Sequence, residues 1–236
     1  MASRLSSQTR HLEEAGLTRL WRWSERFTVG WLAQVDSTNT ALKALAQAGA
    51  PDGFCLGADE QTAGRGQYGR TWHSPAGEGL YCSLLFRPPC LTSDQLHHVT
   101  TFAGLMVHDT LARFVGTPAR LAVKEPNDVF LDRRKVAGIL VEADWQGGVL
   151  RFVIVGIGVN IGQVSFQEGL RQPATSLHLA LGEAAPPREA VLDALLNAFQ
   201  DHWDAFLADP AGVVAVRRQD ICFLPSTFHD RQERPY

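Results

Sequence analysis

Residues 57–86 read GADEQTAGRGQYGRTWHSPAGEGLYCSLLF, which is a strand-like run, a glycine-rich loop and a second apolar run. Glycine lets the backbone take positive φ and approach a ligand closely, while successive N–H groups and arginine side chains donate to phosphate oxygens. This arrangement predicts a loop that wraps an anionic small molecule between two strands.

Two other interpretations of the loop stand beside this one. Gly64 to Gly69 match the Gly-x-Gly-x-x-Gly pattern of dinucleotide-binding folds. That pattern opens a helix and is followed about twenty residues later by an acidic residue. Here Pro75 and the glycines that follow it prevent a regular helix, which disfavours a dinucleotide site. A surface loop without a ligand stays open as an alternative, because glycine-rich turns are common.

Two later segments also combine polar and apolar residues. Lys124-Glu-Pro-Asn-Asp128 is a polar turn between two β-rich runs, in which Pro126 favours an extended Glu125. Lys135 is expected just before a strand that starts at Gly138. Because these polar groups lie among mainly apolar strands, we expect several of them to converge on one cleft.

The pattern of elements predicts an α+β fold, with a mixed β-sheet and helices packed on it. Expected strands and helices follow from apolar periodicity and turn signals. The expected strands are 31–35, 53–58, 80–86, 120–123, 129–131, 138–145 and 149–157, and the expected helices are 40–48, 93–114 and 188–207.

Three segments follow one another along the chain: the loop 64–75, the run from Lys124-Glu-Pro-Asn-Asp128 through Lys135 to Gly138-Ile-Leu-Val-Glu142, and Gly156-Ile-Gly-Val-Asn160. In this order they resemble the catalytic domain of biotin protein ligases. That family carries Gly-Arg-Gly-x-x-Gly-Arg-x-Trp-x-Ser-Pro, then Lys-Trp-Pro-Asn-Asp, then a lysine before Gly-Ile-Leu-x-Glu, and Gly-Ile-Gly-x-Asn. A Ser-Thr-Asn motif near the start of the domain matches Ser37-Thr38-Asn39 here. The resemblance covers residues 31 to 182 and implies a biotin ligase/lipoate ligase-like fold related to class II synthetases.

The resemblance also implies a two-step reaction with biotin, ATP and Mg²⁺. Biotin and ATP form biotinyl-5'-AMP, and the biotinyl group then passes to a lysine of a biotin carboxyl carrier protein. Mg²⁺ is expected as the partner of ATP, with no metal site in the chain itself. Because attack of a carboxylate on a phosphate brings anions together, cationic donors are needed. The candidate catalytic residues are Arg65, Arg70, Lys124 and Lys135.

Similarity to the family assigns the remaining roles. The residues expected to bind biotin are Ser37, Thr38, Asn39, Gln61, Arg65, Gly66, Gln67, Trp72, Lys135 and Gly138. The residues expected to bind the nucleotide are Gly64, Arg70, Trp72, Asn127, Asp128 and Asn160.

Simpler roles remain open for some of these residues. Ser37 or Thr38 could only cap a helix, Trp72 could be a core anchor, and Asp128 could be a turn residue. The pair Gly156 and Gly158 is interpreted mainly as tight strand packing.

Two positions depart from the family pattern. Glu125 stands where the family most often has tryptophan, which replaces an aromatic wall by a carboxylate. Gln67 stands where many members have a second arginine of the loop. We expect a weaker hold on the adenylate phosphate and a leakier intermediate, because a cation is lost and an anion is added.

Composition sets further bounds. The chain has 236 residues, of which 45% are hydrophobic, which suffices for one sizeable core. A net charge of −3 gives no support for nucleic-acid binding, and no apolar run reaches membrane-spanning length. No secretory signal is evident, so the cytoplasm is the expected location. Cys55 and Cys82 are expected to be reduced and buried, and the pair His97-His98 has no companion ligands for a metal.

The expected domain organisation is an N-terminal extension at 1–27, a catalytic domain at 28–208 and a short tail at 209–236. The extension is too short for a winged-helix DNA-binding domain, so we expect no DNA contact. The tail lacks the repeated strands of the SH3-like domain found in larger family members. Both a monomer and a homodimer remain open.

Two other functions remain open beside the ligase. One is a lipoate ligase or octanoyltransferase of the same fold, which the Gly-Arg-Gly loop followed by Trp-x-Ser-Pro disfavours. The other is a biotin- or nucleotide-binding protein without catalysis, which the Glu125 departure and the short tail motivate.

Overall fold

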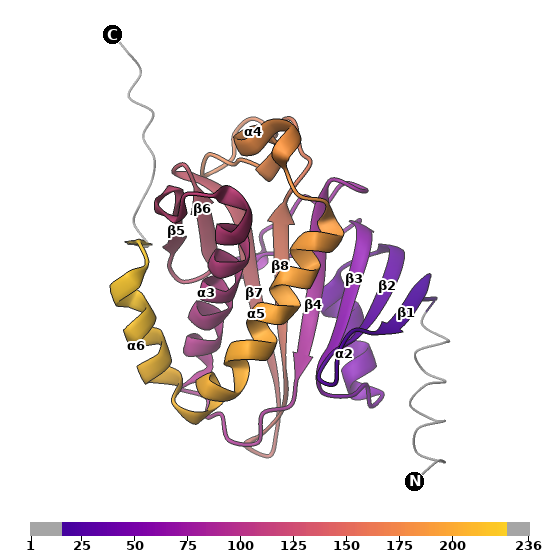
Figure 1. Cartoon of the computed structure of the whole chain (residues 1–236). Helices are drawn as coiled ribbons and strands as arrows, with labels where there is room; N and C mark the ends of the chain where they lie inside the picture. Colours follow the sequence, from indigo (N-terminus) through magenta and orange to yellow (C-terminus); the bar gives the residue numbers. More distant parts are fainter. Residues whose placement is uncertain (1–15, 226–236) are drawn as a thin grey trace.

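The computed structural model describes residues 16–225. They form a mixed sheet in the strand order β1-β2-β3-β4-β8-β7-β6-β5-β9 (Figure 1). The pairs β2/β3 and β5/β9 are parallel, and the other neighbours are antiparallel. The strands are β1 (Arg19–Arg22), β2 (Thr28–Val35), β3 (Phe54–Gln61), β4 (Gly79–Phe86), β5 (Leu121–Lys124), β6 (Asp128–Leu131), β7 (Arg134–Gln146), β8 (Val149–Asn160) and β9 (Phe223–Leu224).

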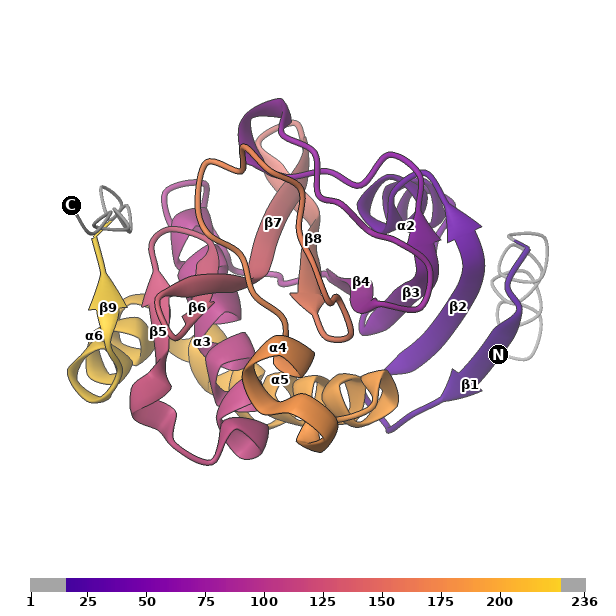
Figure 2. The ribbon, with the colours of Figure 1, turned by 90° about the horizontal axis from the view of Figure 1, so that it is seen from above.

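Helices cover both faces of this sheet. In the view from above, α3, α5 and α6 lie on one side of the sheet and α2 lies on the other (Figure 2). The architecture confirms the predicted α+β class with helices on a mixed sheet. The α-helices of the described part are α2 (Thr38–Gln47), α3 (Leu96–Val115), α4 (Leu177–Leu181), α5 (Arg188–Ala208) and α6 (Pro210–Asp220).

The strands alternate between two hydrophobic cores. In β4, Cys82 and Phe86 belong to the larger core with α3 and α5, whereas Leu85 belongs to the smaller core beneath α2. Ser83 shares the α2 face of the strand and is fully buried. Cys55 and Cys82 are buried free thiols, as expected. Because both faces of β4 are covered, its sequence does not alternate between apolar and polar residues, and Ser83 is its one polar side chain apart from the Tyr81 hydroxyl.

The expected strands and helices are present, with boundaries shifted by a few residues. The difference with a consequence for the site concerns Lys135, which lies inside β7 and not before it. Asp132 and Arg133 have φ values of 49° and 64°. Positive φ at both central residues suits a two-residue hairpin turn, so β7 pairs with β6 from its first residue, Arg134, and not from Gly138.

The sheet extends beyond the range expected for the catalytic domain. β1 lies in the expected extension 1–27 and pairs with β2, while α6 and β9 lie in the expected tail 209–236 and β9 pairs with β5. Residues 1–15 and 226–236 of those two segments lie outside the described residues. In the described part, every helix is too short or too polar to cross a bilayer.

An aromatic stack joins the sheet to its main helical layer, and its loss is expected to destabilise the fold. Trp203 of α5 is 1% exposed and stacks on Phe86 of β4, with ring centroids 3.9 Å apart. Trp203→Ala should lower the free energy of unfolding by about 3–5 kcal/mol, because it leaves a large cavity. Urea unfolding measures this change. Trp145→Ala, at a side chain that is 37% exposed, is the control, and an equal loss in both variants would contradict the prediction.

Candidate functional site

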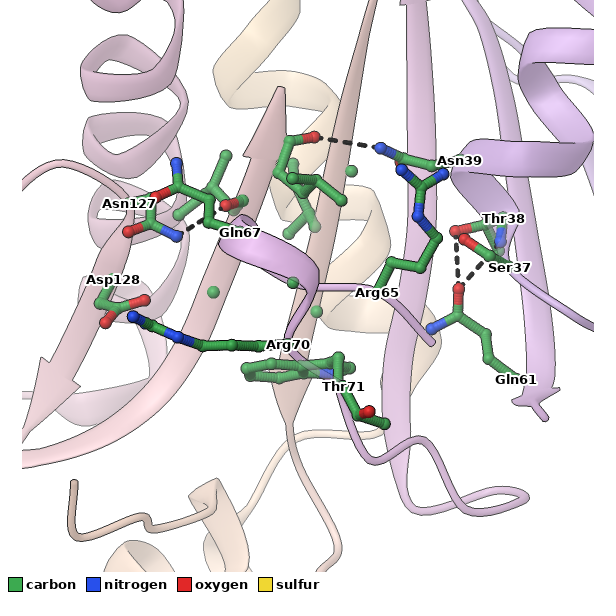
Figure 3. Close-up of a pocket in the computed structure, with 18 of the residues that line it drawn as sticks. Ser37, Thr38, Asn39, Gln61, Arg65, Gln67, Arg70, Thr71, Asn127 and Asp128 are labelled. Carbon is green, nitrogen blue, oxygen red and sulfur yellow. Dashed lines mark hydrogen bonds between the residues drawn. The ribbon is translucent and has the colours of Figure 1, made fainter. Parts of the chain in front are cut away.

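A cavity opens on the α2 face of the sheet, where the glycine-rich loop crosses the strands. Figure 3 shows Ser37, Thr38 and Asn39 on one side of it and Asn127 and Asp128 on the other. The cavity is lined by Ser37, Thr38, Asn39, Gln61, Arg65, Gly66, Gln67, Arg70, Thr71, Trp72, Asn127, Asp128, Lys135, Gly138, Ile139, Leu140, Gly156, Ile157 and Gly158.

Most of the site residues expected from the sequence therefore meet at one place. Three of them do not line the cavity: Gly64, Lys124 and Asn160. Gly156 and Gly158, for which the sequence predicts mainly tight packing, also line it. Thr71 and the segment 139–140 also line it without having been expected.

The indole of Trp72 packs against two paired glycines. Gly138 of β7 and Gly158 of β8 are direct neighbours across the antiparallel ladder. A Cβ atom would lie 2.8 Å from the indole at Gly138 and 2.4 Å from it at Gly158, so neither position accepts a side chain. The buried Nε1 of Trp72 has no hydrogen-bond partner among residues 16–225. Trp72 belongs to neither hydrophobic core and lines the cavity, while its Nε1 lies against Gly158.

A hydrogen-bond network fixes the polar side chains at the start of α2. The backbone N–H and hydroxyl of Thr38 donate to Oε1 of Gln61 at 2.8 and 3.1 Å, and Nε2 of Gln61 donates to the Ser74 hydroxyl at 2.8 Å. The buried Ser83 hydroxyl lies 2.8 Å from Oγ1 of Thr38 and donates to Oδ1 of Asn39 at 2.6 Å. The network orients both side chains of α2.

The helix-cap interpretation does not account for these residues. Ser37 occupies the N-cap position of α2, but its side chain makes no capping hydrogen bond. The Thr38 side chain is directed to β3 and β4. Both residues are buried and line the cavity, so their side chains are available to the site rather than to the helix end.

Glu142 links the network to the glycine-rich loop. Its carboxylate accepts hydrogen bonds from Nδ2 of Asn39 and from Nη2 of Arg65, each at 2.8 Å. Arg65 also donates to Thr40 at 3.2 Å. No role had been assigned to Glu142 from the sequence. The available signal was its spacing, because residues four apart on a strand, such as Gly138 and Glu142, lie on the same face.

The opposite end of the cavity is cationic. Nζ of Lys135 lies 2.6 Å from Oδ1 of Asp128 and 5.2 Å from the centre of the Trp72 ring. Lys124 pairs with Asp128 across the β5–β6 hairpin and is 3% exposed. Burial lowers the pKa of Lys124, and the neighbouring charges of Lys135 and Arg70 lower it further against the opposing effect of Asp128. Lys124 therefore stands behind Asp128 and does not contact the cavity.

The two asparagines of the expected nucleotide side have different surroundings. Nδ2 of Asn127 donates to the Ile139 carbonyl at 3.0 Å while the residue lines the cavity. Asn160 is buried and donates to the Thr175 carbonyl at 3.0 Å. Asn160 thus holds the segment that follows β8, and the structure does not bring it to the cavity.

The glycine-rich loop folds back on itself. The backbone N–H of Trp72 donates to the Gly64 carbonyl at 2.9 Å, and that of Gly66 donates to the Arg70 carbonyl at 2.7 Å. A Cβ atom at Gly64 would lie 2.3 Å from the Trp72 carbonyl oxygen, so glycine is needed there for the close approach of two backbones. Tyr68 has a φ of 58° and is 85% exposed at the tip.

The two departures from the family pattern lie in different places. Gln67 lines the cavity, so the missing arginine concerns the site directly. Glu125 does not line it, and its carboxylate forms an ion pair with Arg218 of α6. The repulsion expected from Glu125 is therefore offset by a cation in direct contact with it.

Comparison with known proteins agrees with this geometry. The chain matches the Biotin/lipoate A/B protein ligase family over residues 31–160. It is 40% identical over 191 residues to the biotin–[acetyl-CoA-carboxylase] ligase of Paracoccus denitrificans, a match that covers 79% of this chain and 76% of that protein. The chain belongs to this family.

Longer relatives share the same part. The bifunctional ligase/repressor BirA of Bacillus spizizenii is 36% identical over 177 residues, which cover 73% of this chain and 53% of that protein. The chain thus spans about half the length of that curated relative.

Solved structures of family members have the same fold. The biotin protein ligase from Aquifex aeolicus in complex with biotin and ATP is 34% identical, with a TM-score of 0.63 over 77% of this chain and 72% of that chain. The biotin protein ligase from Leishmania major in complex with biotinyl-5-AMP has a TM-score of 0.69 over 88% of this chain and 86% of that chain. At 23% identity, it supports the fold alone.

The Ser83 hydroxyl is expected to stabilise the site through Asn39. Ser83→Ala should lower the free energy of unfolding by about 1–3 kcal/mol, because Oδ1 of Asn39 then loses its buried donor. In an Asn39→Ala background the same change should cost much less, since the acceptor is already absent. Urea unfolding of the four proteins of this cycle measures the coupling. Strictly additive losses would show that the hydrogen bond contributes nothing.

Proposed function

We propose that this chain is the catalytic part of a biotin protein ligase. It activates biotin with ATP to biotinyl-5'-AMP and transfers the biotinyl group to a lysine of a biotin carboxyl carrier protein. The observation that carries the proposal is one cavity in which the Ser37–Asn39 motif, the glycine-rich loop and Lys135 meet. Family membership and the likeness to the Aquifex aeolicus enzyme with biotin and ATP support it.

The end of the cavity at α2 suits the ureido ring of biotin. Thr38, Asn39 and Gln61 are neutral, and their donors and acceptors are held by hydrogen bonds to one another and to β-strands. A preorganised neutral polar surface recognises a neutral polar ring without the desolvation cost of a buried charge. The Trp72 indole supplies an apolar wall next to this surface.

The cationic end suits the activation step. A carboxylate oxygen of biotin attacks the α-phosphorus of ATP, the bond from that phosphorus to the bridging oxygen breaks, and pyrophosphate leaves. Lys135 and Arg70 line the cavity and would neutralise the charge that develops on the phosphoryl oxygens. Arg65 would contact the ligand from the glycine-rich loop. Lys124, which lies behind Asp128, would contribute its positive charge without touching the ligand.

The transfer step needs an amine and protection from water. The neutral amine of the carrier lysine attacks the acyl carbon of the mixed anhydride, and AMP leaves, so no covalent enzyme intermediate forms. The glycine-rich loop, which lines the cavity from Arg65 to Trp72, would keep water from the anhydride until the carrier arrives.

Mg²⁺ would enter with ATP. Residues 16–225 contain no group of three or more His, Cys, Asp or Glu side chains placed to hold a metal ion. Asp128 is a carboxylate at the nucleotide end, and oxygen ligands of this kind suit Mg²⁺. We infer that the phosphate oxygens of ATP would supply most of the ligands of Mg²⁺ and that the Asp128 carboxylate would lie near the ion.

The partners in this proposal are biotin, ATP and the unmodified carrier of an acyl-CoA carboxylase. The reaction would take place in the cytoplasm, where ATP is abundant. Contact with DNA is not part of the proposal, in line with a net charge of −3.

Mass spectrometry of an unmodified carrier domain after incubation with this protein, biotin and Mg-ATP tests the proposal. We expect biotinylation of one carrier lysine with release of AMP and pyrophosphate. Lys135→Ala should slow both steps by about 100-fold or more, because a donor aimed at the developing charge is lost. Lys43→Ala is the matched control, since Lys43 lies on α2 and does not line the cavity.

Each other result has a defined meaning. Pyrophosphate without carrier labelling would limit the function to adenylate formation. Binding of biotin by calorimetry with neither product would indicate a non-catalytic binding protein. Labelling with lipoate or octanoate in place of biotin would assign the chain to the other branch of the family.

Gln67→Arg is expected to slow the release of biotinyl-AMP. An arginine at this cavity-lining position can form a charge-assisted hydrogen bond to the adenylate phosphate, which should reduce the dissociation rate by about tenfold or more. Rapid gel filtration of the preformed complex measures that rate. Tyr68→Arg adds the same charge at the exposed loop tip and serves as the control. An unchanged rate in Gln67→Arg would reject the leaky-intermediate hypothesis.

A further inference from the structure

The turn between β5 and β6 contacts the segment that follows α5, which consists of α6 and β9. β9 pairs in parallel with β5, with Val123 opposite Phe223 and Lys124 opposite Leu224. The backbone N–H of Val123 also donates to the Cys222 carbonyl at 2.9 Å. This segment lies beyond residues 31–160, the part matched by the family. The support of the turn therefore comes from residues outside that match.

A side-chain contact adds to this backbone pairing. The Arg218 guanidinium of α6 forms an ion pair with the Glu125 carboxylate and lies 5.1 Å from the centre of the Phe223 ring. The preceding residue, Arg217, has a different partner, because it donates to Asp109 of α3 at 2.6 Å. Two neighbouring arginines of α6 thus have separate tasks: one attaches the helix to α3, and the other contacts the turn.

The contact matters because of what flanks Glu125. Lys124 and Asp128 form the cross-strand pair at the base of the turn, and Asn127 lines the cavity. Two residues of chain span at most about 7 Å, so the Glu125 backbone lies close to the proposed nucleotide end. A carboxylate there opposes a bound triphosphate unless a cation neutralises it.

We propose that Arg218 is a positioning and charge-compensating residue for the nucleotide half of the site, acting through Glu125. It neutralises the carboxylate that stands where the family usually has tryptophan, and it directs that carboxylate towards α6. The departure at Glu125 and the presence of Arg218 are two parts of one arrangement. This inference rests on the proposed function, since it assumes that ATP binds at the Asn127–Asp128 end.

A double-mutant cycle separates charge compensation from simple attachment of α6. The variants are Arg218→Gln, Glu125→Gln and the two combined, with Arg217→Gln as a control of equal charge on the same helix. The readouts are KM for ATP and KM for biotin in biotin-dependent pyrophosphate release. Biotin serves as the internal reference, because its proposed site lies at the other end of the cavity.

We expect Arg218→Gln to raise KM for ATP about two- to fivefold, the range for an ion pair near the surface, and to leave KM for biotin unchanged. The effect should shrink at high salt, because exposed charges are screened. Glu125→Gln should change little. The combined variant should return to the KM of the unaltered protein, since no unpaired carboxylate remains. The reversed pair, Glu125→Arg with Arg218→Glu, should restore it as well.

Three results would overturn the inference. One is an unchanged KM for ATP in Arg218→Gln. Another is a combined variant as impaired as Arg218→Gln, which would mean that Arg218 only attaches α6. The third is an equal rise in KM for ATP with Arg217→Gln. If the unaltered protein releases no pyrophosphate, the proposed function fails separately, and dissociation constants for ATP from calorimetry give the same four-way comparison.

Discussion

Three glycines on one face of β7 and β8 leave the centre of the sheet without side chains at the place where the cavity lies. Gly138 and Gly158 are paired across the ladder and admit the Trp72 indole, and Gly156 admits the Asn39 carboxamide, whose Oδ1 would lie 2.1 Å from an added Cβ atom. The other site residues depend on this space. With larger residues at these positions, both the loop and the start of α2 would be pushed off the sheet.

Register makes this arrangement possible. On the α2 face, Tyr81, Gly158, Gly138 and Asp128 form one row across β4, β8, β7 and β6, and Ser83 lies beside Gly156 in the next row. A slip of one residue in any of these strands would move its side chains from the α2 face to the larger core beneath α3 and α5. The stacked aromatic residues of that core, with both faces of β4 covered, therefore also hold the site in register.

The two ends of the cavity differ in charge. At α2 the polar groups are neutral and hydrogen-bonded to one another through Ser83 and Gln61. At the other end, Lys135 and the buried Lys124 flank Asp128. A fixed neutral surface suits recognition of a ring, whereas clustered cations suit developing negative charge. Glu142 accepts hydrogen bonds from Asn39 at the start of α2 and from Arg65 of the glycine-rich loop. One carboxylate therefore links the neutral end of the cavity to the loop.

The sequence by itself determined the class of the fold and the order of most strands and helices, because apolar periodicity is a local property. Most residues of the cavity followed from the resemblance of the spaced motifs to the biotin protein ligase family. Only the tertiary structure decided which residues stand behind the site. Lys124, Asn160 and Gly64 carry motif positions yet do not line the cavity, while Glu142 and Ser83 support it without having been assigned a role. The partner of Glu125 was likewise hidden, since Arg218 is 93 positions away along the chain. Contacts of this kind depend on strand register and helix docking, which pair residues far apart in sequence and leave no local pattern to read.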